Sequence, residues 1–116
     1  MARYTGLMKV WIFESNLIWS SRFVNTVRGS GHEAVVKSVV PEDSADVAIV
    51  NLGDSNVGEI VAELTKRGIY TIAHAGHKEK ELLELGREIL VDRVASNSEI
   101  TNKLPKMLEE AFLQKS

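Results

Sequence analysis

The stretch Val47-Ala48-Ile49-Val50-Asn51-Leu52 begins with an apolar run that no polar residue interrupts before Asn51. A strand inside a parallel sheet needs such a run, because helices cover both of its faces. Outward from this stretch lie other short apolar runs, and segments with helical spacing separate most of them. The runs that we predict as strands are residues 9–13, 33–40, 47–52, 70–73 and 89–91. This alternation predicts an α/β fold built on a five-stranded parallel sheet.

The segments between most of these runs carry residues that start and stop helices. Serine and asparagine cap helix starts, and glycine ends helices because it accepts the left-handed conformation. Ser96-Asn97-Ser98-Glu99 fits a capping box at the start of the last helix. The expected helices run from Ser15 or Asn16 to Gly29 or Gly31, from Asn56 to Gly68, from Lys78 to Gly86, and from Ser96 or Ser98 to Ala111.

One connection is shorter than a parallel crossover usually allows. Only residues 41–46 separate the second and third predicted strands, whereas a crossover usually takes a dozen residues or more and includes a helix. We therefore expect the second helix of the fold to be missing or reduced to one turn. Its absence would expose apolar surface, which predicts a contact with a partner or a second copy there. The alternative is a hairpin turn between antiparallel strands.

Length and composition limit the class of protein. The chain has 116 residues, fewer than the roughly 150 expected for one domain, so we predict a single domain over residues 8–116 after a leader at 1–7. The formal net charge of −2 disfavours a nucleic-acid partner. The chain has no cysteine, which excludes disulfides and thiolate catalysis. No apolar run is long enough for a signal peptide or a membrane span, so we expect a cytoplasmic protein that does not contact a membrane.

Chemistry in an open α/β sheet collects beyond the carboxyl ends of the strands. The polar residues expected there are Glu14 and Ser15 after the first strand, Asn51 and Asp54 at the end of the third, His74 and His77 at the fourth, and Arg93 at the fifth. The order of elements, the acidic Glu14 and the run Ile-Val-Asn-Leu-Gly at residues 49–53 make residues 8–113 resemble the receiver domains of response regulators. That resemblance implies a flavodoxin-like sheet with strand order 2-1-3-4-5.

The chain departs from the residues that the resemblance implies. Receivers hold magnesium with two adjacent acidic residues and accept a phosphoryl group on an aspartate after strand three. They place a hydroxyl residue after strand four and a lysine after strand five. Here those positions hold Glu14 and Ser15, Asn51, His74 and Arg93. Because a carboxamide has no anionic oxygen to attack phosphorus, we expect a pseudo-receiver that is not phosphorylated. We expect it to need no cofactor and to act through contacts with a protein partner or a second copy.

Four alternatives concern the same pocket. Asp54 could replace the missing phosphoryl acceptor, although the loop would have to carry it back toward the strand end. Glu14, Asp54, His74 and His77 could bind zinc or a similar metal, although two histidines in a surface loop more often bind none. Arg93 could bind an anion or could form a salt bridge with Glu14, and we favour the salt bridge. Glu14, His74, His77 and Arg93 could instead serve a small enzyme or a ligand-binding protein.

Overall fold

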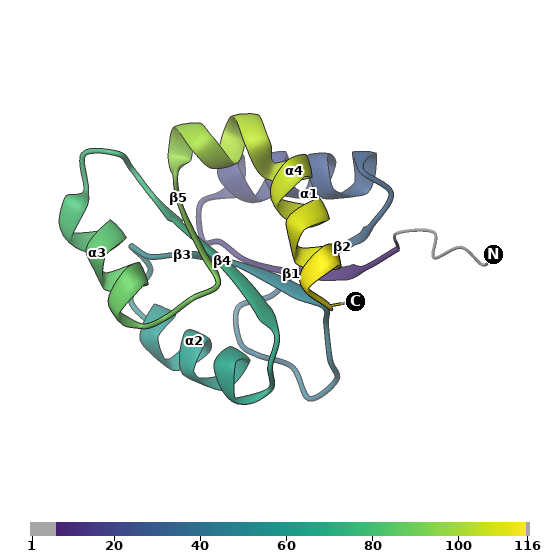
Figure 1. The fold of residues 1–116 in the computed structure, drawn as a ribbon, viewed down its shortest axis with the longest axis horizontal. Coiled ribbons are helices and arrows are strands. Elements are labelled where there is room, and N and C mark those ends of the chain that lie inside the picture. The colour runs from purple at the N-terminus through teal and green to yellow at the C-terminus, as the bar shows by residue number, and fades with distance from the viewer. Residues whose placement is uncertain (1–6, 116) are drawn as a thin grey trace.

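The computed structural model describes residues 7–115, and its five strands form one parallel sheet (Figure 1). The strands are β1 (Lys9–Phe13), β2 (Glu33–Val36), β3 (Val47–Asn51), β4 (Tyr70–Ala75) and β5 (Arg93–Ser96). Their order in the sheet is β2-β1-β3-β4-β5, which confirms the predicted parallel sheet and strand order. Of the expected leader at 1–7, residues 1–6 lie outside the described part of the chain.

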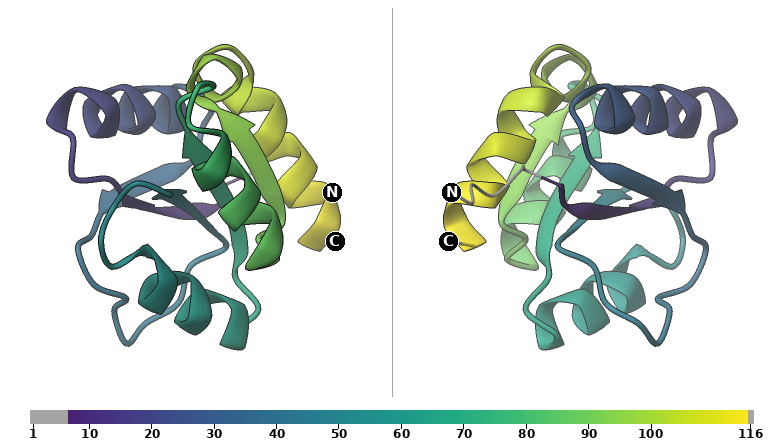
Figure 2. Two further views of the ribbon diagram at one scale, coloured as in Figure 1. Left: turned by 90° about the vertical axis from the view of Figure 1, so that its left-hand side faces the viewer. Right: turned by 90° about the vertical axis from the view of Figure 1, so that its right-hand side faces the viewer.

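Helices cover both faces of the sheet (Figures 1 and 2). They are α1 (Leu17–Gly29), α2 (Val57–Lys66), α3 (Lys80–Glu88) and α4 (Asn97–Lys115). Successive strand residues point to opposite faces, so Ile12 and Ile49 pack with α1 and α4, whereas Trp11 and Val50 pack with α2. None of the helices within residues 7–115 is long and apolar enough to cross a membrane.

Glycines end α1 and α2 as predicted. Gly31, just beyond α1, has a φ of 89°, and Gly68, just beyond α2, has a φ of 70°. Gly86 was predicted to end the third helix, and that prediction is wrong. The helix continues to Glu88, and a Cβ at Gly86 would come within 3.0 Å of the Leu52 side chain. Close packing against the sheet, not helix termination, explains this glycine.

The connection between β2 and β3 contains no helix, as predicted. Residues 37–46 form an irregular segment, and β2 pairs with β1 in parallel, so the hairpin alternative is wrong. Arg67, the residue directly after α2, holds this segment by donating to the carbonyl oxygens of Pro41 and Asp43 at 2.7 and 3.0 Å. Ala45 is buried against the core on the α2 side, so the segment covers part of the area that a helix would occupy. The prediction that the second strand reaches residue 40 is wrong, because pairing ends at Val36.

The fifth strand lies later in the chain than predicted. Residues 89–91 are not a strand, because they form the turn that ends α3: the Ile89 amide donates to the Leu85 carbonyl at 2.9 Å. Leu90 has a φ of 59°, a left-handed conformation that no regular strand contains. β5 therefore begins at Arg93. The predicted first, third and fourth strands differ by at most two residues at their ends, since β3 stops at Asn51 and β4 continues to Ala75.

Leu90→Gly is expected to raise the free energy of unfolding by about 0.5 to 1 kcal/mol, because glycine adopts the left-handed conformation without a Cβ clash. Leu90 is 79% exposed, so its removal sacrifices little packing. Urea denaturation followed by circular dichroism measures the change. Leu90→Ala is the matched control, since it removes the same apolar surface and keeps the Cβ atom. A glycine variant no more stable than the alanine variant would contradict the explanation.

Candidate functional site

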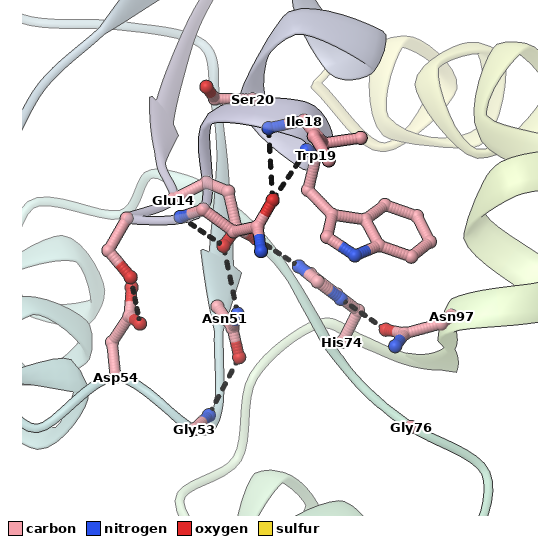
Figure 3. A network of polar contacts seen from close by, with 12 residues as sticks. Glu14, Ile18, Trp19, Ser20, Asn51, Gly53, Asp54, His74, Gly76 and Asn97 are labelled. Carbon is pink, nitrogen blue, oxygen red and sulfur yellow. Dashed lines mark hydrogen bonds and ion pairs between the residues drawn. The ribbon is translucent and has the colours of Figure 1, made fainter.

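Polar side chains from four segments meet beyond the carboxyl ends of the strands (Figure 3). Glu14 follows β1, Asn51 ends β3, His74 lies near the end of β4, and Asn97 begins α4 directly after β5. Asn51 and His74 are neighbours in the register of β3 and β4. Because all strands are parallel, these ends lie at one edge of the sheet. The site is thus assembled from residues far apart in the sequence.

The carboxylate of Glu14 is the centre of this network. Its Oε1 lies 2.8 Å from Nε2 of His74, and its Oε2 accepts hydrogen bonds from Asn51 Nδ2 at 2.9 Å and from the Asn16 amide at 3.1 Å. The Glu14 side chain is 0% exposed. A buried charge is tolerated when it is paired and fully hydrogen-bonded, and the three donors meet that requirement.

The surroundings of Glu14 favour its ionised form. Burial alone would raise the pKa of this carboxyl group, but hydrogen bonds from His74, Asn51 and the Asn16 backbone, together with the charge of His74, outweigh burial and lower the pKa below its usual value of 4.5. Hydrogen bonds to a carboxylate stabilise the charged form and not the neutral one. Glu14 is therefore an anion at neutral pH.

His74 is buried between an acid, an amide and aromatic rings. Its Nδ1 lies 2.7 Å from Oδ1 of Asn97, and its ring packs against Trp19 and Phe23 of α1 with centroids 5.9 and 5.2 Å away. Since Nε2 faces the Glu14 carboxylate and Nδ1 faces a carbonyl oxygen, both ring nitrogens face acceptors. Both ring nitrogens are therefore occupied, with Glu14 on one side and Asn97 on the other. The site holds a buried histidine–carboxylate pair between His74 and Glu14.

Asn51 uses both ends of its amide group. Its Nδ2 donates to Glu14, and its Oδ1 accepts the Gly53 amide at 2.8 Å. The sequence analysis expected this residue at the end of the third strand, and β3 ends there. A carboxamide held in this way provides no anionic nucleophile at that strand end.

Ser15 and Asp54 join the two loops that follow β1 and β3. The Ser15 hydroxyl donates to Asp54 Oδ1 at 2.8 Å, while the neighbouring Asn16 caps α1 by accepting the amides of Ile18 and Trp19. Ser15 and Asp54 line an open groove of about 610 Å³ that also contacts Lys37 and the start of α2. Asp54 thus faces this groove and is held by a hydroxyl from the opposite loop.

Arg93 does not join the network. It begins β5, so it lies at the amino end of that strand, whereas Glu14 follows the carboxyl end of β1. Its Nε is 3.8 Å from Oε1 of Glu110 on α4. The expectations that Arg93 follows the fifth strand and pairs with Glu14 are wrong, because the strand was placed too early in the sequence.

His77 is an exposed residue of the loop between β4 and α3. Within residues 7–115, no three histidine, aspartate or glutamate side chains converge as a metal-binding group. Both ring nitrogens of His74 are already used by Glu14 and Asn97. Of the four residues considered for an enzyme, Glu14 and His74 are in contact, whereas Arg93 contacts Glu110 and His77 is exposed in its loop.

Asn97 is a site residue that was not predicted from the sequence. Ser96-Asn97-Ser98-Glu99 was predicted to form a capping box, and the structure confirms it: Glu99 accepts the Ser96 amide and the Ser96 hydroxyl accepts the Glu99 amide, both at 3.1 Å. A helix that begins at this box fixes the end of the preceding strand at Ser96. That signal could have placed β5 correctly and shown Asn97 at the carboxyl edge.

Comparison with known proteins identifies the fold. No family model matches the chain, and no curated protein sequence matches it. Solved structures do match. The receiver domain of the Francisella response regulator 1452 is 12% identical with a TM-score of 0.77, covering 94% of this chain and 99% of that one. A response regulator receiver domain protein from Clostridium thermocellum is 16% identical with a TM-score of 0.78, covering 94% and 97%.

A third similar structure is described as one of a family of redox sensors in the streptococci that evolved from two-component response regulators. It is 11% identical with a TM-score of 0.75, and the match covers 92% of this chain and 52% of that one. At these identities the similarity establishes architecture, and function must be argued from the site. The chain has the fold of a response regulator receiver domain.

Proposed function

We propose that this chain is a pseudo-receiver: a cytoplasmic signalling module that is not phosphorylated and acts through contacts with proteins. The observation that carries the proposal is the network in which Glu14 accepts from both Asn51 and His74. An amide occupies the strand end where a receiver has its phosphoryl acceptor, and the acid that follows β1 is held by hydrogen bonds from the protein itself.

The residues of the pocket do not fit a magnesium ion. Magnesium prefers carboxylate and other hard oxygen ligands with free lone pairs. Glu14 already accepts three hydrogen bonds, Ser15 supplies a hydroxyl that donates to Asp54, and the Asn51 oxygen accepts from Gly53. Binding a cation would require breaking the buried pair with His74. Phosphoryl transfer assisted by magnesium therefore lacks both its nucleophile and its metal ligands.

A receiver fold without phosphorylation can still carry a signal through binding. One similar structure is described as a redox sensor that evolved from response regulators, which is an example of this fold with a changed input. In the present chain Val36, which ends β2, and Val39, in the irregular segment that follows, are exposed, at 48% and 68%. Exposed apolar residues of this kind favour a protein contact.

Incubation with acetyl phosphate and magnesium, followed by intact mass measurement, tests the proposal. We expect no phosphoryl adduct, under conditions that label a receiver domain with an acceptor aspartate. Asp54→Asn is the matched control, because Asp54 is the nearby carboxylate that could replace the acceptor. A stable adduct on the unmodified chain would overturn the proposal, and its loss in Asp54→Asn would identify Asp54 as the acceptor.

A further inference from the structure

The outer side of β2 is an open edge of the sheet. No strand within residues 7–115 pairs with it, since β2 ends the strand order. The amides of Glu33 and Lys37 donate inward to the Met8 and Ile12 carbonyls of the β1 side, at 2.8 and 2.9 Å. Backbone groups alternate in direction along a strand, so those of Ala34 and Val36 point outward.

One contact confirms the direction of these outward groups. The Ala34 carbonyl accepts from Nη2 of Arg28 on α1 at 3.3 Å, a long hydrogen bond that leaves the second lone pair available. An unpaired edge is a template for another strand. The side chain of Val36 beside it is 48% exposed, so the edge offers both backbone groups and apolar surface.

The charged residues along the outer edge of β2 are complementary to those of a second copy of the same strand. Glu33 precedes Ala34-Val35-Val36, and Lys37 follows it. If a second copy pairs in the antiparallel direction about Val35, Glu33 of each chain lies opposite Lys37 of the other. Parallel in-register pairing would instead place like charges side by side, which is destabilising. The charges of β2 therefore favour antiparallel pairing with β2 of a second copy.

We propose that two copies of this chain associate by antiparallel pairing of β2, with Val35 on the two-fold axis. The proposal rests on the function proposed above and names the partner as a second copy of the chain. Ala34 of each copy exchanges both backbone hydrogen bonds with Val36 of the other, and the two sheets become one continuous sheet. The interface is isologous, as most dimer interfaces are.

Charge reversal tests the pairing register. Sedimentation velocity over a range of concentrations is expected to show a dimer that dissociates on dilution. Glu33→Lys and Lys37→Glu each create two like-charge pairs and should weaken association by about tenfold, whereas the double variant should restore it. Glu84→Lys, at a glutamate on α3 whose side chain is 61% exposed, is the control and should leave the dimer unchanged.

Cysteine cross-linking tests the position of the axis. The chain has no cysteine, so a single introduced thiol can bridge only two copies. Residues on the axis of such a pair have Cα atoms about 4.5 Å apart, within the range for a disulfide of about 4.4 to 6.8 Å. Val35→Cys should therefore form a disulfide dimer on mild oxidation. Val39→Cys, more exposed but four residues from the axis, should not.

The outcomes of these experiments distinguish a failure of the proposed dimer from a failure of the proposed pseudo-receiver function. A chain that stays monomeric at about 1 mM, equal effects of the single and double charge variants, or faster cross-linking at residue 39 than at residue 35 would overturn the pairing of β2. None of these outcomes would produce a phosphoryl adduct. Conversely, an adduct with acetyl phosphate would overturn the pseudo-receiver while leaving the dimer intact.

Discussion

Replacing His74 with leucine is expected to lower the free energy of unfolding by about 3 to 5 kcal/mol, the range for leaving a buried charge without its partner. The Glu14 carboxylate, 0% exposed, would lose the hydrogen bond to His74 Nε2 while remaining buried. Asn97 would also lose the partner of its Oδ1, now 2.7 Å from Nδ1 of His74. Urea denaturation at pH 7, followed by circular dichroism, measures the loss.

His77→Leu is the matched control for this prediction. It makes the same substitution three residues later in the chain, at an exposed position, so we expect a change within about 0.5 kcal/mol. The double variant Glu14→Leu/His74→Leu removes both members of the pair and should recover part of the stability lost by His74→Leu, since replacing both members of a buried pair is often neutral. Equal losses for His74→Leu and His77→Leu would show that no buried pair contributes to stability.

The sheet could be predicted from sequence because its strands have a strong local signal. Residues 47–50 are apolar without interruption, and only a strand covered on both faces suits so short a run. The absence of a helix between β2 and β3 could also be predicted, because six residues between two predicted strands leave no room for a helix. Both inferences depend on the length of the segment between two strands and on side-chain polarity, which can be read directly from the sequence.

β5 was misplaced because its local signal is weak. Ile89-Leu90-Val91 has the composition of a strand, yet Leu90 adopts a φ of 59° in the turn after α3. The true strand, Arg93–Ser96, contains two polar residues among its four. Tertiary contacts determine which of these segments forms the strand. The Thr71 carbonyl accepts the Asp92 amide at 3.0 Å, which sets the register of β5 beside β4.

The candidate site, too, could be predicted from the sequence only in part. Parallel topology predicted correctly that Glu14, Asn51 and His74 reach the same edge, because each follows or ends a strand. It did not predict that His74 pairs with Glu14, 60 residues away. Arg93 was the expected partner, and only coordinates show that it lies at the other end of β5. A strand end can be assigned from sequence, whereas the partners of a side chain there depend on the exact ends of every neighbouring strand.

Asn51→Asp is expected to lower the free energy of unfolding by about 2 to 4 kcal/mol at pH 7, because it converts a hydrogen bond into repulsion between carboxylates. Nδ2 of Asn51 now donates to Oε2 of Glu14 at 2.9 Å, so an aspartate oxygen there would face an anion. The Nε2 atom of His74 contacts only Glu14, so it would not offset the second carboxylate. Asn56→Asp is the matched control: Asn56 precedes α2 without a side-chain cap, where aspartate is favoured, so stability should be unchanged or slightly higher.

The pH dependence distinguishes repulsion from lost packing. In the unmodified chain the pKa of Glu14 is lowered from 4.5, so its contribution to stability is present above that value and is lost as the pH falls through the folded-state pKa. In Asn51→Asp the two carboxyl groups hold a proton more tightly when folded than when unfolded. Their penalty is therefore present at neutral pH and disappears as the pH falls below the ordinary carboxyl pKa of about 4. Stability curves for the two proteins should converge in acid, and a difference that stays constant from pH 7 to 4 would show that charge repulsion is not its cause.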